Sequence, residues 1–568
     1  MSEGNYFSHV APGAVQPARP AHQTLAFWAI VAIVGAVWFL TLDARHLLPT
    51  DEGRYAEIAR EMFKSGDWVT IRYNGLKYFE KPPFHLWATV LAYEAFGVGE
   101  WQARLWSAIS GAGGLAMAVV TAQRWFGRRA ALLSGCVLLA APAWNLAGHF
   151  NSLDIGVAFA LTCAVGAFLM AQHPLASPAQ ARRWMWFAWA AMGVAVLTKG
   201  LIGIVLPGLA LVVYSAVARD WALWRRLHIV SGLALFLLVT APWFVIVSLR
   251  NPEFLQFFFI HEHWQRYTSN VHHRTGAWWY FGPQIVVGFL PWLGLLPRIA
   301  RVVARDPREH VFRPALFLAV WVVVPLVFFS ASSSKLPGYI IPIYPAMAIL
   351  AGVALDDIDR IAWDRQIFAM LFVASVGLLA APFIARLGSG PESMASYHAF
   401  APWVAAGCIL GIAGLAYARF LNRRDTPLSI VAFSLAFFGL TTVVLSGHES
   451  FGRNSSGFAL AAQVRAATLP AMPIYSVRLL DHTLPFYMRH ITVMVESPDE
   501  LAFGTQQEPD KWLPTVGAFV NEWKSSRRAA AIMSHDTYKG LREQGVVMFP
   551  VAEDGRRVAV TNFARPAP

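Results

Sequence analysis

The chain has 568 residues, of which 56% are hydrophobic and only 14% are charged. Soluble domains average about 25% charged residues, so this composition excludes an ordinary soluble globular protein. Apolar runs of about 20 residues recur along the chain, and each is long enough to cross a bilayer as a helix. The formal net charge is +12. Its Lys and Arg residues gather in short loops between apolar runs, which indicates topology signals rather than nucleic-acid binding.

The first 25 residues are rich in Ala, Pro, Gly and His and lack a cleavable signal pattern. This predicts a cytoplasmic tail, 1–25, followed by a span that serves as the signal anchor. A transmembrane domain is predicted over 26–447, with about thirteen spans. The spans are expected near 26–42, 103–122, 130–148, 155–172, 184–198, 201–218, 229–249, 281–297, 314–331, 338–355, 366–385, 401–418 and 428–446.

The distribution of arginines predicts a single orientation. With the N-terminus inside and alternating spans, every short cytoplasmic loop carries Arg. These residues are Arg124, Arg128, Arg129, Arg182, Arg183, Arg219, Arg225, Arg226, Arg298, Arg301, Arg305, Arg308, Arg419, Arg423 and Arg424. The loop around Asn151–Asp154, on the other side, has no Lys or Arg. The long loops 43–101 and 250–280 and the region after 448 are therefore expected outside the cytoplasm.

Two charged clusters stand in the first external loop. They are Asp51-Glu52-Gly53-Arg54-Tyr55 and Phe79-Glu80-Lys81-Pro82-Pro83. Apolar residues at helical spacing over 52–63 predict an amphipathic helix on the membrane surface, with Thr50 or Asp51 as its N-cap and Ser65-Gly66-Asp67 as its end. A shorter helix over 84–97 is expected at the interface. Asp51 and Glu52 suit a helix N-terminus, but basic groups and carboxylates together beside a bilayer also suit a phosphate-bearing lipid.

Further candidates follow along the chain. Asp154 and Lys199 stand at the external ends of predicted spans, where an ionisable residue is a functional hypothesis by default. The aromatic loop 250–280 contains His261, His263 and Arg266. A His-x-His pair would make a zinc site if Glu80 approached it. Lys335 and Tyr339 precede a later span, and headgroup contact explains them equally well.

Some chemistry is absent from the sequence. The three cysteines, Cys136, Cys163 and Cys408, all fall within predicted spans, which predicts neither a disulfide framework nor a metal site. There is no P-loop, no Gly-rich dinucleotide fingerprint and no His-Glu-x-x-His helix. An ATP-driven machine and a metalloprotease therefore lack support.

Residues 448–568 are predicted to form a small α/β domain outside the cytoplasm, because short β-type runs alternate with helical stretches. The strands are expected at Met472–Val477, Ile491–Val495, Ala529–Met533, Gly545–Val551 and Val558–Thr561. Helices are expected at Ser456–Ala467 and Thr537–Gln544.

Several motifs together resemble a known family. They are Asp51 to Met62, Ser65-Gly66-Asp67-Trp68-Val69-Thr70, Asn74 to Pro83, Asn151-Ser152-Leu153-Asp154, Thr198-Lys199-Gly200, Lys335-Leu336-Pro337-Gly338-Tyr339 and Asp499 to Gly504. The chain resembles the bacterial aminoarabinose transferase family, and more broadly the protein-O-mannosyltransferase-like branch of the GT-C glycosyltransferases. The resemblance implies a polytopic α-helical GT-C fold with periplasmic juxtamembrane helices and a small C-terminal α/β periplasmic domain.

The resemblance also implies a function. It points to a multi-pass enzyme of the bacterial inner membrane that moves 4-amino-4-deoxy-L-arabinose from undecaprenyl phosphate to a lipid A phosphate at the periplasmic face. Such transfer lowers the negative charge of the outer surface and gives resistance to polymyxin and other cationic peptides. No cofactor is expected for the core reaction, although the family allows a bound zinc ion.

Site residues are carried over from the resemblance one by one. Asp51 and Asp154 are implied as catalytic. Substrate-binding roles are implied for Arg54, Tyr55, Lys81, Lys199, Arg266, Tyr339 and Glu500, and metal binding for Glu80 and His261. Two alternatives stay open at this point. One is a related polyprenyl-phosphate-sugar transferase that acts on protein or another glycan, and the other is a non-catalytic lipid transporter.

Overall fold

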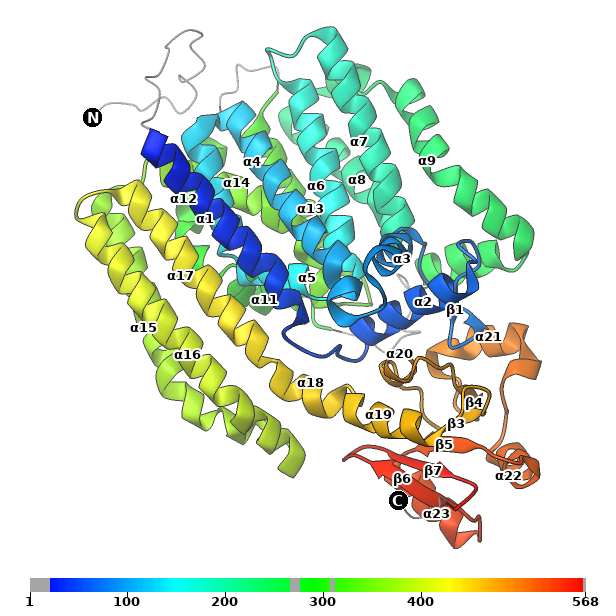
Figure 1. The fold of residues 1–568 in the computed structure, drawn as a ribbon. Coiled ribbons are helices and arrows are strands. Elements are labelled where there is room, and N and C mark those ends of the chain that lie inside the picture. The colour runs from blue at the N-terminus through cyan, green and yellow to red at the C-terminus, as the bar shows by residue number, and fades with distance from the viewer. Residues whose placement is uncertain (1–20, 266–275, 307–311, 565–568) are drawn as a thin grey trace.

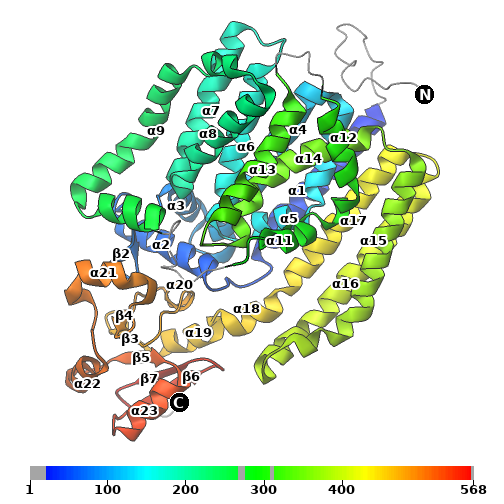
Figure 2. The same ribbon diagram turned by 180° about the vertical axis from the view of Figure 1, so that it is seen from behind.

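The computed structural model describes residues 21–265, 276–306 and 312–564. A helical bundle carries a smaller sheet domain at one end (Figures 1 and 2). Among the described residues, the helices of the bundle are α1 (Ala21–Leu40), α4 (Glu100–Leu139), α5 (Pro142–His149), α6 (Leu153–Gln172), α7 (Pro178–Lys199), α8 (Ile202–Ala218), α9 (Ile229–Arg250), α11 (Phe281–Gly288), α12 (Leu296–Ala304), α13 (Pro314–Ala331), α14 (Tyr344–Asp356), α15 (Arg360–Ala380), α16 (Pro391–Asn422) and α17 (Thr426–Gly447).

In the described part of the chain, nine helices are long and apolar enough to cross a membrane. The helices Phe281–Gly288 and Leu290–Ala304, bent by 90°, make a tenth if they form one span. The other three predicted spans, 130–148, 184–198 and 201–218, are helical but fail on length or composition. The first is divided between α4 and the eight-residue α5, α7 carries three basic residues, and α8 has 17 residues. The chain is therefore a multi-pass membrane protein, as predicted.

The boundary predicted between the second and third spans is a break in α4. Gly127 interrupts this helix with a φ of +87° and a ψ of 173°. A positive φ is readily adopted only by glycine, so this residue allows the chain to leave the helical path between two apolar stretches. The break falls between 103–122 and 130–148, where the sequence predicted a loop.

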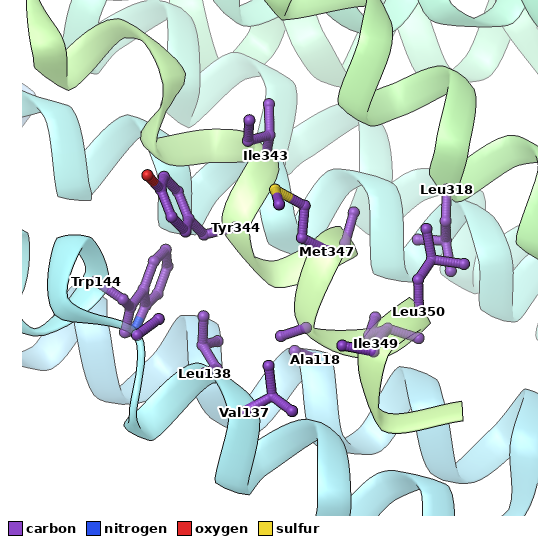
Figure 3. Close-up of a cluster of buried hydrophobic side chains, with 14 of the residues drawn as sticks. Ala118, Val137, Leu138, Trp144, Leu318, Ile343, Tyr344, Met347, Ile349 and Leu350 are labelled. Atoms are coloured by element: carbon purple, nitrogen blue, oxygen red, sulfur yellow. The ribbon is translucent and has the colours of Figure 1, made fainter. Parts of the chain in front are cut away.

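Small residues bring the central helices into close contact. Gly352 of α14 lies directly against Ser134 of α4, with no room for a side chain. Larger buried side chains, among them Trp144, Tyr344 and Met347, belong to the apolar core between the helices (Figure 3). Packing of this kind drives helix association in a bilayer, where apolar burial alone gives no advantage. By contrast, α1, α9, α15 and α16 keep many large apolar side chains exposed, as expected for lipid-facing helices.

Two short helices lie between the bundle and the sheet domain: α2 (Asp51–Ser65) and α3 (Phe84–Phe96) (Figure 1). A hairpin of β1 (Arg72–Tyr73) and β2 (Leu76–Lys77) connects them. As predicted, α2 ends at Gly66, which has a φ of +69°. Its expected position on the membrane surface was wrong, because most of α2 is buried against the bundle and the sheet domain. Its charged residues Glu52, Glu57 and Arg60 are buried as well, since each has an ionic partner.

The C-terminal region follows the expected alternation of helices and strands. Its helices are α18 (Glu449–Ser455), α19 (Phe458–Ala467), α20 (Leu484–Met488), α21 (Ala502–Gln507), α22 (Val516–Ser525) and α23 (His535–Glu543). Its strands are β3 (Ile474–Val477), β4 (Val493–Val495), β5 (Ala530–Met533), β6 (Phe549–Glu553) and β7 (Val558–Thr561). They form one sheet in the order β4-β3-β5-β7-β6, in which β3 runs parallel to β4 and β5 and the other pairs are antiparallel. All five predicted strands are confirmed.

Removal of the buried cation in the sheet domain should destabilise it strongly. The Arg557 guanidinium pairs with Asp481 and Asp554 and is 1% exposed. Arg557→Ala leaves two carboxylates without this partner, so we expect a loss of about 3–5 kcal/mol in the free energy of unfolding. Arg478→Ala is the control, because Arg478 is half exposed in its pair with Glu496 and should lose about 0–1 kcal/mol. Thermal unfolding of the full chain in detergent measures both, and equal losses would contradict the prediction.

Candidate functional site

The predicted site residues lie where three helices begin. Asp51 is the first residue of α2, Asp154 is the second residue of α6, and Lys81 precedes α3 by two prolines. His85, in the first turn of α3, is close to both aspartates. Burial lowers the pKa of the His85 imidazole to about 4, and the Asp51 and Asp154 carboxylates oppose that shift. The starts of α2, α3 and α6 therefore share one location, and helix N-termini favour bound anions.

Arg54 is held between two carboxylates. One turn into α2, its guanidinium donates to Asp51 from Nη2 and to Glu500 from Nη1. The Arg54 side chain is 5% exposed, whereas that of Asp51 is 43% exposed. Glu500 belongs to η7 (Asp499–Leu501) in the C-terminal domain. The sheet domain thus supplies part of the site.

The electrostatics of this group depend on burial. Burial raises the pKa of Glu500 to about 7, and neighbouring carboxylates such as Glu80 add to the shift while Arg54 opposes it. The Tyr55 ring lies 5.1 Å from the Arg54 guanidinium carbon, within the range of a cation–π contact. Burial also raises the pKa of the Tyr55 phenol well above its usual range. Tyr55 is therefore neutral, and its ring contacts the Arg54 guanidinium.

A second charged group forms at the start of α6. The Lys199 ammonium donates to Asp154 Oδ1 and lies 4.7 Å from the centre of the Tyr339 ring. Gly338 runs so close to the Asp154 carboxylate that a side chain at position 338 would overlap it. The fold thus brings together three residues that the sequence singled out in separate motifs.

Lys81 connects the first loop to η3 (Gln256–Gln265). Its Nζ lies 3.8 Å from Oε2 of Glu80 and 3.7 Å from Oε2 of Glu262. Nδ1 of His261 lies 3.2 Å from Oε1 of the same Glu262. Glu80 and His261 are therefore joined through Lys81 and Glu262. Arg266, the remaining residue implied by the resemblance, lies outside the described residues.

The predicted metal ligands, Glu80 and His261, lie in a group of charged side chains. In the ranges that the structure describes, no three His, Cys, Asp or Glu residues are arranged to hold a metal ion. The Lys81 ammonium already supplies positive charge between two carboxylates. Metal binding by Glu80 and His261 therefore stays a prediction.

Sequence reasoning missed an ion cluster next to Asp51. Arg45 Nη1 donates to Oε2 of Glu52 and Arg104 Nε donates to Oε1, each at 2.7 Å. All three side chains are buried. Burial alone would raise the pKa of the Glu52 carboxyl, but the two guanidinium groups hold it well below its usual range. Glu52 is an acid in the first turn of α2, as expected, and the structure shows that it is also a buried counter-ion. Arg104 gave a signal, because it stands inside the predicted span 103–122.

His482 of the sheet domain was also missed. Its Nδ1 is hydrogen bonded to the Tyr73 hydroxyl at 2.9 Å and lies 3.5 Å from Oε1 of Glu500. Burial lowers the pKa of its imidazole to about 4. Gly53 approaches the His482 carbonyl so closely that a methyl group would clash with it. The glycine of the Asp51-Glu52-Gly53 motif therefore allows the sheet domain to dock on α2.

An apolar cavity of about 150 Å³ lies elsewhere in the bundle. It is lined by α6, α7, α8 and α13, with Phe168, Met192 and Trp321 among its residues. Phe168 follows Asp154 by 14 residues on α6, which corresponds to about 21 Å along a helix. This cavity is therefore separate from the charged site.

Two family models match the chain. The model described as dolichyl-phosphate-mannose-protein mannosyltransferase matches residues 25–258, and the aminoarabinose transferase C-terminal domain matches residues 460–562. The first match contains Asp51, Lys81, Asp154 and Lys199, and the second contains Glu500. Both matched parts thus contribute to the site described above.

Known proteins resemble the chain over most of its length. The undecaprenyl phosphate-alpha-4-amino-4-deoxy-L-arabinose arabinosyl transferase of Aeromonas salmonicida is 32% identical over 366 residues, which cover 63% of this chain and 66% of that one. The transferase of the same name from Erwinia tasmaniensis is 30% identical over 416 residues, or 70% and 73% of the two chains. The crystal structure of ArnT from Cupriavidus metallidurans bound to undecaprenyl phosphate is 52% identical, with a TM-score of 0.92 and coverage of 96% and 99%.

The raised pKa of Glu500 predicts a pH dependence of stability. Because the folded protein binds this proton more tightly than the unfolded chain, the contribution of Glu500 is greatest at low pH and falls as the pH rises from about 4.5 to about 7. The loss amounts to roughly 3 kcal/mol. Glu500→Gln should flatten the fall in thermal stability over this interval.

Glu543→Gln is the matched control, because Glu543 is an exposed carboxylate of α23 in the same domain. The test is to measure the unfolding temperatures of the unchanged protein, Glu500→Gln and the control variant from pH 4.5 to pH 8. Parallel curves for Glu500→Gln and the unchanged protein would contradict the assignment.

Proposed function

The chain belongs to the aminoarabinose transferase family of GT-C glycosyltransferases, and on this premise we propose that it transfers 4-amino-4-deoxy-L-arabinose from undecaprenyl phosphate to a phosphate of lipid A. The proposal rests mainly on one observation: two charged groups lie at the same end of a transmembrane bundle. They are Asp51–Arg54–Glu500 and Asp154–Lys199–Tyr339. Both the donor and the acceptor of this reaction are phosphates on lipids, and such a location suits them.

The reaction needs positive charge at the leaving group. An oxygen of the acceptor phosphate forms a bond to the anomeric carbon of the sugar while the bond from that carbon to the donor phosphate breaks. Undecaprenyl phosphate leaves with the bonding electrons. Arg54 and Lys81 are fixed cations that stabilise this growing negative charge, because their positions are set before the substrate arrives.

The carboxylates have different roles in this scheme. The acceptor phosphate is already ionised, so it needs little help from a base. Asp51, the most exposed carboxylate of its group, stabilises the positive charge on the sugar or orients the acceptor. Asp154 is paired with Lys199 and places that ammonium for a second phosphate. Tyr339 confines the ammonium from the other side.

The proposal includes a location. Several apolar helices make the chain a multi-pass membrane protein, and the arginine-rich short loops favour a cytoplasmic N-terminus. The charged site and the sheet domain then face the periplasm from the inner membrane. Modification of lipid A there would lower its negative charge and give resistance to polymyxin and other cationic peptides.

One alternative acceptor has an observation in its favour. The mannosyltransferase model, which covers residues 25–258, describes enzymes that act on protein. A sugar acceptor on protein or another glycan would leave lipid A unchanged. Mass spectrometry of lipid A from cells with and without the gene separates the two, because only the proposed function adds a pentosamine. The family membership favours either enzyme over a non-catalytic lipid transporter.

Asp51→Asn should abolish sugar transfer. The change removes a negative charge beside the reacting sugar while it preserves the size of the side chain, so we expect kcat to fall by about 10²-fold or more. The control is Asp43→Asn, because Asp43 is an exposed carboxylate of the same external loop. The assay uses purified protein, undecaprenyl-phospho-aminoarabinose and lipid A. Full activity of Asp51→Asn with normal membrane insertion would rule out the catalytic assignment.

Chelation should leave the reaction intact. Lys81 and Arg54 provide the positive charge that a leaving phosphate needs, so we propose that the core reaction requires no metal. Treatment with a chelator should leave kcat unchanged, and added zinc should not raise it. Loss of activity on chelation that zinc restores, together with loss of zinc binding in His261→Ala, would instead support a metal at Glu80 and His261.

A further inference from the structure

Asn151 lies at the junction of the three helix starts that carry the site. Its side-chain amide donates from Nδ2 to the carbonyl of Glu52 at 3.1 Å. Its Oδ1 is 2.8 Å from Nε2 of His85, and its backbone N–H donates to Oε1 of Glu52 at 3.1 Å. Asn151 is completely buried. A single residue thus connects the first turn of α2, the first turn of α3 and the segment that enters α6.

The chemistry of these three contacts is self-consistent. Because the amide nitrogen of Asn151 donates to a carbonyl, its oxygen is the acceptor, and Nε2 of His85 carries the proton that it accepts. The His85 imidazole is neutral, since burial lowers its pKa to about 4. Asn151 therefore adds no charge to a neighbourhood crowded with charges, and it fixes the orientation of His85.

Glu52 anchors the same junction from the other side. Its carboxylate accepts from Arg45, from Arg104 and from the backbone N–H of Leu48 at 3.1 Å. Arg104 in turn donates to the carbonyls that precede α2. The start of α2 is thus bound to the transmembrane helix α4 through buried charge-assisted hydrogen bonds, which are stronger than neutral ones.

The candidate catalytic residues are the immediate neighbours of this junction. Asp51 precedes Glu52 in the chain, and Asp154 follows Asn151 by three residues, at the start of α6. We propose that Glu52 and Asn151 are positioning residues, which hold the Asp51 and Asp154 groups in register across the site without touching substrate. The expected change in kcat rests on the proposed function. The expected change in the rigidity of the helix starts does not depend on it.

Asn151→Ala tests this inference most cleanly, because it removes the amide contacts to α2 and α3 without leaving a buried charge. With the donor phosphate still held by Arg54 and Lys81, KM for the donor should change little. Misplacement of reacting groups by about 1 Å lowers a rate by about 10²-fold, so kcat should fall by about 10- to 100-fold. The shape of the pH–rate profile should stay the same, since no titrating group is lost.

Asn145→Ala is the matched control. Asn145 is an equally buried asparagine whose amide donates to the carbonyl of Leu139, within the α4–α5 connection. It should lose comparable stability and keep its kcat. If Asn151→Ala fails to fold, Asn151→Ser serves instead, because a shorter hydroxyl cannot reach both Glu52 and His85. A kcat for the Asn151 variant equal to that of Asn145→Ala would overturn the inference.

A second measurement does not depend on activity. Hydrogen exchange of the backbone amides in the first turns of α2 and α6 should accelerate in Asn151→Ala and stay unchanged in Asn145→Ala. Unchanged exchange in both turns would overturn the positioning role even if the protein proved to transfer a different sugar. Absence of transfer by the unaltered protein, with exchange accelerated as expected, would count against the proposed function alone.

Discussion

Glu52 shares a buried site with Arg45 and Arg104 at the point where the transmembrane bundle meets the sheet domain. Removing one partner from such a pair typically destabilises a protein by about 3–5 kcal/mol, because the remaining charge stays buried. Here the carboxylate serves two guanidinium groups, and Arg104 also binds the carbonyls of Leu42, Arg45 and His46. The chain between α1 and α2 is therefore wrapped around one arginine of α4.

This anchor explains how a loop on the outside of a bundle carries a well-defined site. With the start of α2 fixed, Arg54 one turn later points at Glu500 of the sheet domain. Gly53 gives that domain room to approach, since a side chain there would meet the His482 backbone. The sheet domain and the bundle thus hold α2 from two sides. Preorganised charges of this kind act on a reaction without moving when it occurs.

Much of this architecture could be predicted from residue patterns. Apolar runs located the helices, and the short β-type runs located all five strands of the sheet. The charged motifs named Asp51, Arg54, Lys81, Asp154 and Lys199. The fold brings the first four to the starts of α2, α3 and α6, and it brings Lys199, at the end of α7, against Asp154. These patterns are local, and local physics determines them: the thickness of a bilayer, the alternation of a strand and the preferences of a helix terminus.

The rest depends on contacts between distant parts of the chain. Glu52 had the pattern of a first-turn acid, and only the approach of Arg104, 52 residues away, makes it a buried counter-ion. The same holds for His482, which is hydrogen bonded to Tyr73 of the first loop. The amphipathic stripe of α2 predicted one apolar surface beneath it, but a second domain covers the opposite face. The spacing of apolar residues shows which face of a helix is apolar. It does not show that the charged residues on the other face have ion partners and are therefore buried.

The pairing of the site cations with carboxylates has a consequence for the proposed reaction. Arg54, Lys81 and Lys199 each lie against a carboxylate. These ion pairs offset the free-energy cost of placing the three cations at the edge of an apolar bundle. A lipid phosphate that reaches Arg54 therefore replaces one anion with another and does not bury a new charge. Displacing Asp51 from Arg54 loses less packing than displacing Glu500, because the Asp51 side chain is 43% exposed and the Glu500 side chain 17%. An exposed Asp51 beside an enclosed Glu500 thus lets Arg54 exchange one partner while the other keeps the guanidinium in place.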